Sequence, residues 1–206
     1  MLETKLILKE LGCNNEIIKK VIQIEKNKVM NLDPYNNNNC NQYVKDENKE
    51  KILELPNFLK FMNNNYNFYI LNVKNIYECI LALFDDVYFE EEEKINIKYA
   101  EYLRIRLLTD LDEKYSDLKN KKKVREILDN KVSVNEEIFF YIKQYFGINI
   151  FIIKNQNQSV KNYENIENNN CVFIMNIDNN YYPIIGKKDN KNIRLFNLEE
   201  FKQYDS

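Results

Sequence analysis

The sequence predicts an α+β fold in which a small mixed sheet packs on a central helix that carries a cysteine. Three observations predict this fold. Residues 76–87 are apolar on nearly every face, which is typical of a buried helix. Residues 134–146 read as a helix that Gly147 closes, and an apolar strand follows at 148–153. Residues 171–185 read as strand, turn and strand, which is a hairpin.

The N-terminal part of the chain is predicted to be helical. Apolar residues recur at helical spacing over 4–29, with a break at Gly12-Cys13-Asn14-Asn15, so we expect two short helices. The polar, Asn-rich stretch that follows Asp33-Pro34 is typical of an exposed loop. These patterns predict three parts: an N-terminal helical arm at 1–35, an Asn-rich linker at 36–50 and an α/β domain at 51–206.

The rest of the chain supplies the other expected elements. Pro183 has no N–H group and therefore predicts an edge position or a bulge in the second strand of the hairpin. Gly186 to Asn190 are expected to form a turn. Further strands are expected at 68–73, 160–163 and 192–196, and further helices at 97–111, 124–128 and 198–204.

The composition argues against several classes of protein. A net charge of -2 gives no electrostatic case for binding nucleic acid or an anionic membrane. The chain has no apolar run of about 18 residues, so we expect no membrane-spanning helix. The four cysteines are far apart and form no Cys-x-x-Cys pair, which predicts neither a zinc site nor a disulfide framework: Cys13, Cys40, Cys79 and Cys171. We expect a reducing, intracellular location, no metal and no cofactor.

Cys79 lies near the start of the predicted central helix, where the helix dipole favours a thiolate nucleophile. The chain contains no histidine, however, so it has no imidazole to act as a base. The acidic residues Asp85, Asp86 and Glu90 to Glu93 are able to bind a divalent cation, but they lack the alternation of a calcium loop and are interpreted as a solvated loop. The basic run at 119–123 is interpreted as a solvated turn.

With these elements in order, residues 67–186 resemble the ovarian-tumour (OTU) family of cysteine proteases, which includes deubiquitinases and relatives in large DNA viruses. The family's Asp-Gly-Asn-Cys-Leu-Phe loop corresponds to Ile76-Tyr77-Glu78-Cys79-Ile80-Leu81. Its Leu-Arg pair corresponds to Leu103-Arg104, and its helix and strand correspond to 139–153. Its His-Tyr pair, which begins the second strand of a hairpin, corresponds to Tyr181-Tyr182. The resemblance implies an OTU-like, papain-like fold.

Two positions depart from the family. The family's loop aspartate falls at Ile76, and its catalytic histidine falls at Tyr181. Tyrosine keeps its proton near neutral pH because its usual pKa is about 10, so it is a poor base. The sequence therefore predicts a pseudoenzyme in which Cys79 and Tyr181 mark vestigial catalytic positions and Cys79 is a core thiol.

The preference for Asn, Lys, Ile and Tyr is typical of an AT-rich genome. Together with the resemblance, it leads us to expect a non-catalytic structural or interaction protein of a large DNA virus, present in the virion or in its assembly. The expected partners are virion proteins or a ubiquitin-like protein, with no membrane. Two alternatives stay open. One is a thiol-dependent, deubiquitinase-like protease that uses Cys79. The other is a transcription or nucleic-acid accessory factor that uses the lysines at 119–123, 187–188 and 191.

Overall fold

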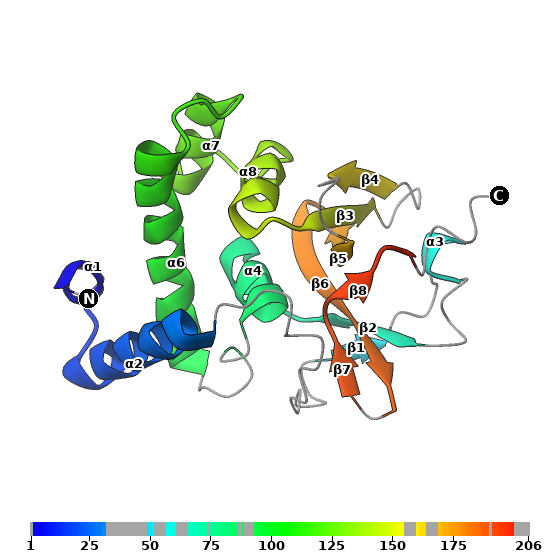
Figure 1. Ribbon diagram of the computed structural model, residues 1–206, viewed down its shortest axis with the longest axis horizontal. Coiled ribbons are helices and arrows are strands. Elements are labelled where there is room, and N and C mark those ends of the chain that lie inside the picture. The colour runs from blue at the N-terminus through cyan, green and yellow to red at the C-terminus, as the bar shows by residue number, and fades with distance from the viewer. Residues whose placement is uncertain are drawn as a thin grey trace. The chain divides into compact units, whose positions relative to one another are not determined.

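The computed structural model describes residues 2–31, 49–51, 57–60, 66–73, 75–85, 88, 93–154, 160–163, 169–189 and 191–199. These residues form a mixed fold of helices and one mixed sheet (Figure 1). The chain divides into two compact units. A helical unit comprises residues 1–37 and 90–133, and a sheet unit comprises residues 38–89 and 134–206.

The helical unit contains four described helices: α1 (Leu2–Glu10), α2 (Asn15–Asn31), α6 (Glu93–Lys114) and α7 (Lys121–Leu128). The break predicted between the first two helices is confirmed. Gly12 adopts a left-handed φ of 70°, which glycine reaches without steric cost and which ends α1. The Asn14 side chain then accepts a hydrogen bond from the Ile17 N–H at 2.9 Å and caps α2.

Helix α6 organises the helical unit. The Thr4 and Tyr102 hydroxyl oxygens lie 3.3 Å apart, and Lys98 Nζ donates to the Leu11 carbonyl at 3.2 Å, so both contacts join α6 to the N-terminal helices. Arg104 Nη1 donates to the carbonyl of Leu128, the last residue of α7, at 2.5 Å. Buried apolar side chains fill the unit, among them Leu8, Ile18, Val21, Tyr99, Leu107, Leu111, Val124 and Leu128.

This division differs from the one that the sequence predicts. The sequence places residues 90–133 in one domain with the sheet, at 51–206. In the structure these residues belong to the same compact unit as residues 1–37. The reason is physical: the apolar stripe of α6 is buried against helices that come much earlier in the chain, and sequence spacing does not show such pairings. The predicted linker at 36–50 lies almost wholly outside the described residues.

The sheet unit is built on eight strands, in the order β1-β2-β6-β5-β3-β4, with β7 paired to β6 and β8 paired to β5. The strands are β1 (Lys49–Lys51), β2 (Asn67–Leu71), β3 (Asn149–Lys154), β4 (Val160–Tyr163), β5 (Asn170–Ile177), β6 (Asn180–Lys188), β7 (Lys191–Ile193) and β8 (Phe196–Asn197). Strands β3 and β5 are parallel, and the other pairs are antiparallel. The predicted mixed sheet is confirmed, and it is larger than expected.

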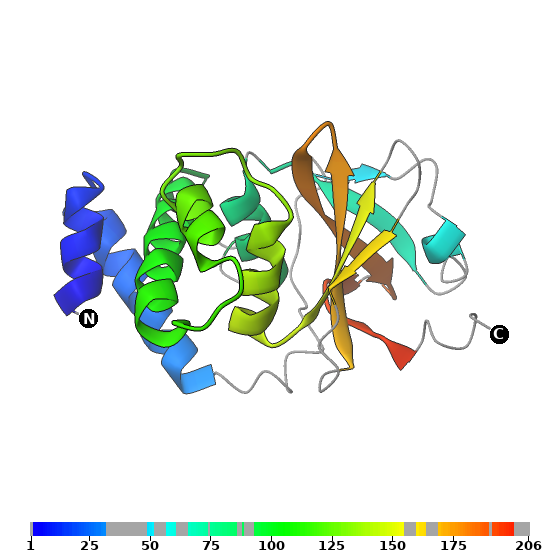
Figure 2. The same ribbon diagram turned by 90° about the horizontal axis from the view of Figure 1, so that it is seen from above.

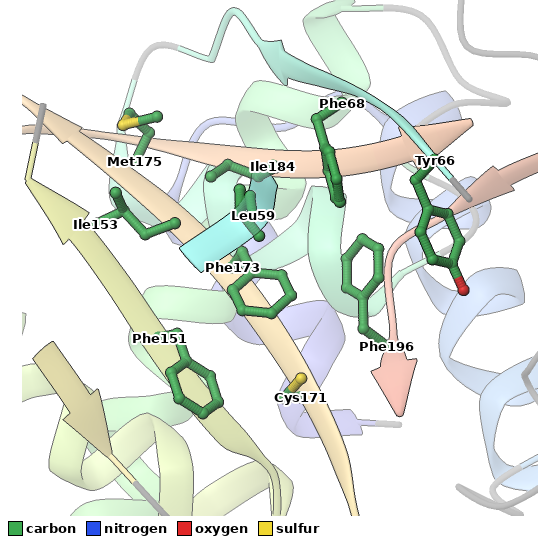
Figure 3. Close-up of a cluster of buried hydrophobic side chains, with 10 residues drawn as sticks. All are labelled: Leu59, Tyr66, Phe68, Phe151, Ile153, Cys171, Phe173, Met175, Ile184 and Phe196. Atoms are coloured by element: carbon green, nitrogen blue, oxygen red, sulfur yellow. The ribbon is translucent and has the colours of Figure 1, made fainter. Parts of the chain in front are cut away.

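Both faces of the sheet are covered within this unit. Helices α4 (Ile76–Phe84) and α8 (Glu137–Phe146) lie on one face, and α3 (Asn57–Lys60) lies on the other (Figures 1 and 2). Strand β3 is apolar at consecutive positions because its side chains are buried on both faces. The face near α3 carries an aromatic-rich cluster (Figure 3): Leu59, Tyr66, Phe68, Phe151, Ile153, Cys171, Phe173, Met175, Ile184 and Phe196.

The hairpin of β5 and β6 forms as predicted. Asp178 and Asn179, at the turn, both have positive φ angles, 50° and 64°, which match the tight turn that a two-residue hairpin favours. The edge position expected from Pro183 is wrong, because β6 lies between β5 and β2. The missing N–H is tolerated because the pairing with β2 begins at Ile184, one residue beyond the proline.

Three other predictions around this sheet need correction. Gly186 lies inside β6, not in a turn, and the chain reverses after Lys188 instead. The single strand expected at 192–196 is two short strands, β7 and β8. The helix expected at 198–204 lies outside the described residues beyond Glu199.

The helices differ from their predicted bounds at several ends. The central helix ends at Phe84, and α6 begins at Glu93 and runs to Lys114, so it is longer than the predicted 97–111. The closure of α8 at Gly147, which has a φ of 62°, is confirmed. Before α8, the Asn135 side chain accepts from the Glu137 N–H at 2.9 Å, although Glu136 is the residue at the N-cap. None of the described helices has the length and apolarity needed to cross a membrane.

Candidate functional site

The candidate site is the N-terminal end of α4, where a cysteine protease would place its thiolate and its oxyanion hole. Asn75 precedes the helix in an extended conformation, with φ -157° and ψ 172°. Its Oδ1 accepts hydrogen bonds from the N–H groups of Tyr77 at 2.9 Å and Glu78 at 3.0 Å. Its Nδ2 donates to Glu78 Oε1 at 3.3 Å. Asn75 and Glu78 therefore form a reciprocal cap on α4.

Cys79 is the fourth residue of α4. Its backbone N–H donates to the Asn75 carbonyl at 3.0 Å, which is an ordinary intrahelical bond. The N–H groups of Tyr77, Glu78 and Cys79 are thus all engaged within the cap and the helix. An oxyanion hole needs N–H groups that point at the reacting carbonyl, and these three groups point at Asn75 instead.

The thiol of Cys79 is fully buried. Burial raises the pKa of the Cys79 thiol well above its ordinary value, because the thiolate would lose its solvation. The residues around it along α4, from Ile76 to Leu83, are buried as well. Reactive cysteines are partly exposed and have a lowered pKa, so the environment of Cys79 is that of a structural thiol.

Tyr181 lies at the start of β6, on the strand against which α4 packs. Its ring packs on Phe139 of α8, with centroids 5.0 Å apart. Burial raises the pKa of Tyr181 above its ordinary value, and a hydrogen bond with the Asn176 side chain opposes this only in part. The phenol therefore keeps its proton at neutral pH and contributes packing, not a base.

The acidic residues predicted as a solvated loop are only partly described. Asp85 is 3% exposed and ends α4, with its N–H donating to the Leu81 carbonyl at 2.7 Å. Asp86 and residues 90–92 lie outside the described part of the chain. Within that part, no three His, Cys, Asp or Glu side chains are grouped in a way that could hold a metal ion.

The basic run is also different from the prediction. Lys121, Lys122 and Lys123 form the first turn of α7 and not a turn before it. Lys121 and Arg125 both form ion pairs with Asp112 of α6, so part of this positive charge joins two helices. In the sheet unit, Lys188 Nζ lies 5.4 Å from the centroid of the Tyr66 ring.

Sequence reasoning missed the roles of three residues: Asn75, Arg194 and Gly186. For Asn75 the sequence does carry a signal, because the spacing Asn75-x-x-Glu78 is a variant of the capping box. Arg194 is the second: it is 5% exposed and donates to two carbonyls at the end of α4. Gly186 is the third, because a Cβ there would meet Tyr66 and Phe196 at 3.0 and 3.1 Å. No local pattern marks the last two residues, since their partners are distant in the sequence.

No protein-family model matches the chain, and no curated protein matches it. A solved structure described as "Structure of Ovarian Tumor (OTU) domain in complex with Ubiquitin" is similar to it at 12% sequence identity and a TM-score of 0.45. The likeness covers 75% of this chain and 84% of that one. A superposition at this level assigns neither a site nor a partner to the chain.

Proposed function

We propose that this chain is a non-catalytic, OTU-like module that binds another protein. The observation that carries the proposal is the state of the α4 N-terminus. Asn75 engages the N–H groups that an oxyanion hole would need, and Cys79 is fully buried beside them. The chain has no histidine to act as a base, and among the described residues the thiol and the N–H groups at the start of α4 are not available for thiol catalysis.

An interaction role requires an accessible surface. Among the described residues, the large apolar side chains that are exposed are Leu6, Val132 and Phe140. Phe140 lies on α8 and is 45% exposed. Aromatic residues are enriched at protein interfaces, where a few of them contribute most of the binding energy. Phe140 is therefore the first residue to change in a binding assay.

We propose a ubiquitin-like protein as the first partner to test, on the strength of the sequence resemblance at 67–186. A virion or assembly protein of a large DNA virus is the second, on the strength of the composition. In both cases the chain would act inside the infected cell or in the particle.

The first experiment is labelling with a ubiquitin probe that carries a C-terminal electrophile. We expect no covalent adduct on the folded chain, because the Cys79 thiol is buried and protonated. An adduct that Cys79→Ser abolishes would establish the alternative, a thiol-dependent protease, and would overturn the proposal. A chain unfolded in urea serves as the control, since its thiols must react with a small alkylating reagent.

The second experiment measures binding directly. Unlabelled chain is titrated into isotope-labelled ubiquitin, and we expect amide resonances to shift at one face of ubiquitin. Phe140→Ala should weaken this binding, whereas Gln144→Ala, on an exposed position of the same helix, should not. If no resonance shifts at saturating concentration, ubiquitin is excluded. If cross-linking in particles also finds no protein neighbour, the interaction role is wrong.

The same material tests the nucleic-acid alternative. The net charge of -2 and the pairing of Lys121 and Arg125 with Asp112 weigh against it. Affinity for a nucleic acid that falls steeply with salt would support that alternative. No binding at low salt would remove it.

A further inference from the structure

We propose that residues 191–197 form a strap that holds the C-terminal end of α4 and controls its local opening. The strap comprises β7, Arg194, Leu195 and β8. It begins directly after the turn that follows β6 and crosses to β5. The strap is distinct from the vestigial catalytic positions, and it acts at the opposite end of α4 from Asn75.

Both ends of the strap are anchored in the sheet. At one end β7 pairs with β6, with Ile193 opposite Gly186. At the other end β8 pairs with β5, with Phe196 opposite Cys171. The Phe196 ring lies in the aromatic cluster, 5.0 Å from Phe173 between centroids (Figure 3).

Arg194 lies between the two anchors and points at α4. Its side chain is 5% exposed, and its Nη1 donates to the carbonyls of Ala82 and Asp85, each at 3.1 Å. The last carbonyls of a helix have no partner within the helix, and a positive charge there interacts favourably with the helix dipole. A residue 112 and 109 positions away in the chain thus completes the end of α4.

The opening of α4 is coupled to that of the strap because breaking the Arg194 hydrogen bonds is costly. If the end of α4 opened alone, a buried guanidinium would lose two acceptors, which is more costly than the loss of a neutral hydrogen bond. If the strap detached while α4 stayed in place, the carbonyls of Ala82 and Asp85 would lose the Arg194 donor. We therefore expect α4 and the strap to open together. Because Cys79 lies on α4, its accessibility to reagents depends on the strap.

The test is hydrogen exchange, followed by mass spectrometry of peptides from the full chain. Arg194→Met keeps most of the side-chain length and removes every donor. We expect exchange in α4 and alkylation of Cys79 to become about tenfold faster or more, with exchange in β3 unchanged. Arg104→Met is the matched control, since Arg104 donates to the Leu128 carbonyl of α7. It should leave exchange in α4 as it is.

Two outcomes overturn the proposal. One is unchanged exchange in α4, and the other is equal acceleration in α4 and β3, which would mean a general loss of stability. If Arg194→Met fails to fold, hydrogen exchange of the unmodified chain tests the proposal instead. In guanidinium concentrations below the unfolding transition, amides of α4 and of the strap should share one opening free energy that differs from that of β3. Separate values for α4 and the strap would contradict the coupling.

Discussion

The aromatic ring of Tyr181 packs against that of Phe139, with the ring centroids 5.0 Å apart and the planes inclined by 59°. This contact joins β6 to α8 at the position where the resemblance to OTU proteases places a catalytic histidine. The residue at that position belongs to the core, since Tyr181 is 7% exposed. Packing is the role that the structure shows for the Tyr181 ring.

We expect that Tyr181→His will not create a thiol protease. The substitution removes the ring contact with Phe139 and leaves Cys79 buried, so the ubiquitin probe should still form no adduct. The loss of buried aromatic area should lower the free energy of unfolding by about 2–3 kcal/mol. Urea unfolding and intact-mass measurement check both parts. Tyr181→Phe keeps the ring and serves as the control. It should cost only about 1 kcal/mol, from the lost hydrogen bond with Asn176.

Two substitutions in α4 separate packing from chemistry. Cys79→Ala removes one buried atom and should cost about 1 kcal/mol or less. Leu83→Asp places a carboxylate where the native side chain is 1% exposed, so it should unfold the sheet unit or cost more than about 4 kcal/mol. Thermal melts of the two variants measure these losses of stability. A chain that tolerates Leu83→Asp but is unfolded by Cys79→Ala would mean that the side of α4 carrying Leu83 is not in the core. Gln144→Asp, at an exposed position of α8, is the control.

Burial of the Cys79 thiol predicts a loss of stability in alkali. The folded pKa is raised above the unfolded value of about 8.5, so the folded chain keeps a proton that the unfolded chain releases. Below about pH 8.5 the Cys79 thiol keeps its proton in both states, so its effect on the free energy of unfolding does not depend on pH. Above that pH the free energy of unfolding falls, by up to about 1.4 kcal/mol per pH unit.

Urea unfolding of the native chain and of Cys79→Ala, each from about pH 7.5 to 10, measures this effect. The free energy of unfolding should fall more steeply for the native chain, so the two should converge in alkali. Cys13→Ala removes a partly exposed thiol and should change the slope less. Parallel curves for the native chain and Cys79→Ala would show that the thiol is accessible in the folded state.

Gly186 is expected to be sensitive to any side chain. An added Cβ would lie 3.0 Å from Tyr66 Cδ1 and 3.1 Å from Phe196 Cε1, closer than carbon atoms normally approach. Gly186→Ala should therefore cost about 1–3 kcal/mol in urea unfolding. Phe196→Leu removes the obstructing Phe196 Cε1 and leaves the Tyr66 ring in place. The double variant should be less destabilised than the sum of the two single variants, and strict additivity would argue against a steric cause.

The cap on α4 should contribute measurably to stability. Asn75→Ala leaves the N–H groups of Tyr77 and Glu78 without their acceptor and should cost about 1–2 kcal/mol. Asn135→Ala, just before α8, removes the acceptor of one N–H group, that of Glu137, and should cost less. Equal and negligible costs for both variants would mean that solvent replaces Asn75, and the N–H groups of α4 would then be open to a ligand.

Features decided by neighbouring residues were predictable from the sequence. The break at Gly12, the closure of α8 at Gly147 and the hairpin turn at 178–179 all depend on local backbone preferences. The first two were found where they were expected, and the turn lies within the predicted hairpin at 171–185. The buried character of 76–84 and of β3 also followed from the sequence, because a segment that is apolar on nearly every face has no side suited to solvent. The absence of histidine excludes an imidazole base without any structure.

Tertiary structure decided everything that depends on distant partners. The sequence predicts Cys79 to be a core thiol, but only the fold shows that its helix packs against β6, which comes much later in the chain. Nothing near Arg194 in the sequence indicates that it donates to Ala82 and Asp85. Nothing near residues 90–133 indicates that they pack with 1–37. The reason is that local backbone energies and periodicity act over a few residues, whereas burial and hydrogen-bond satisfaction depend on segments that meet only in the folded chain.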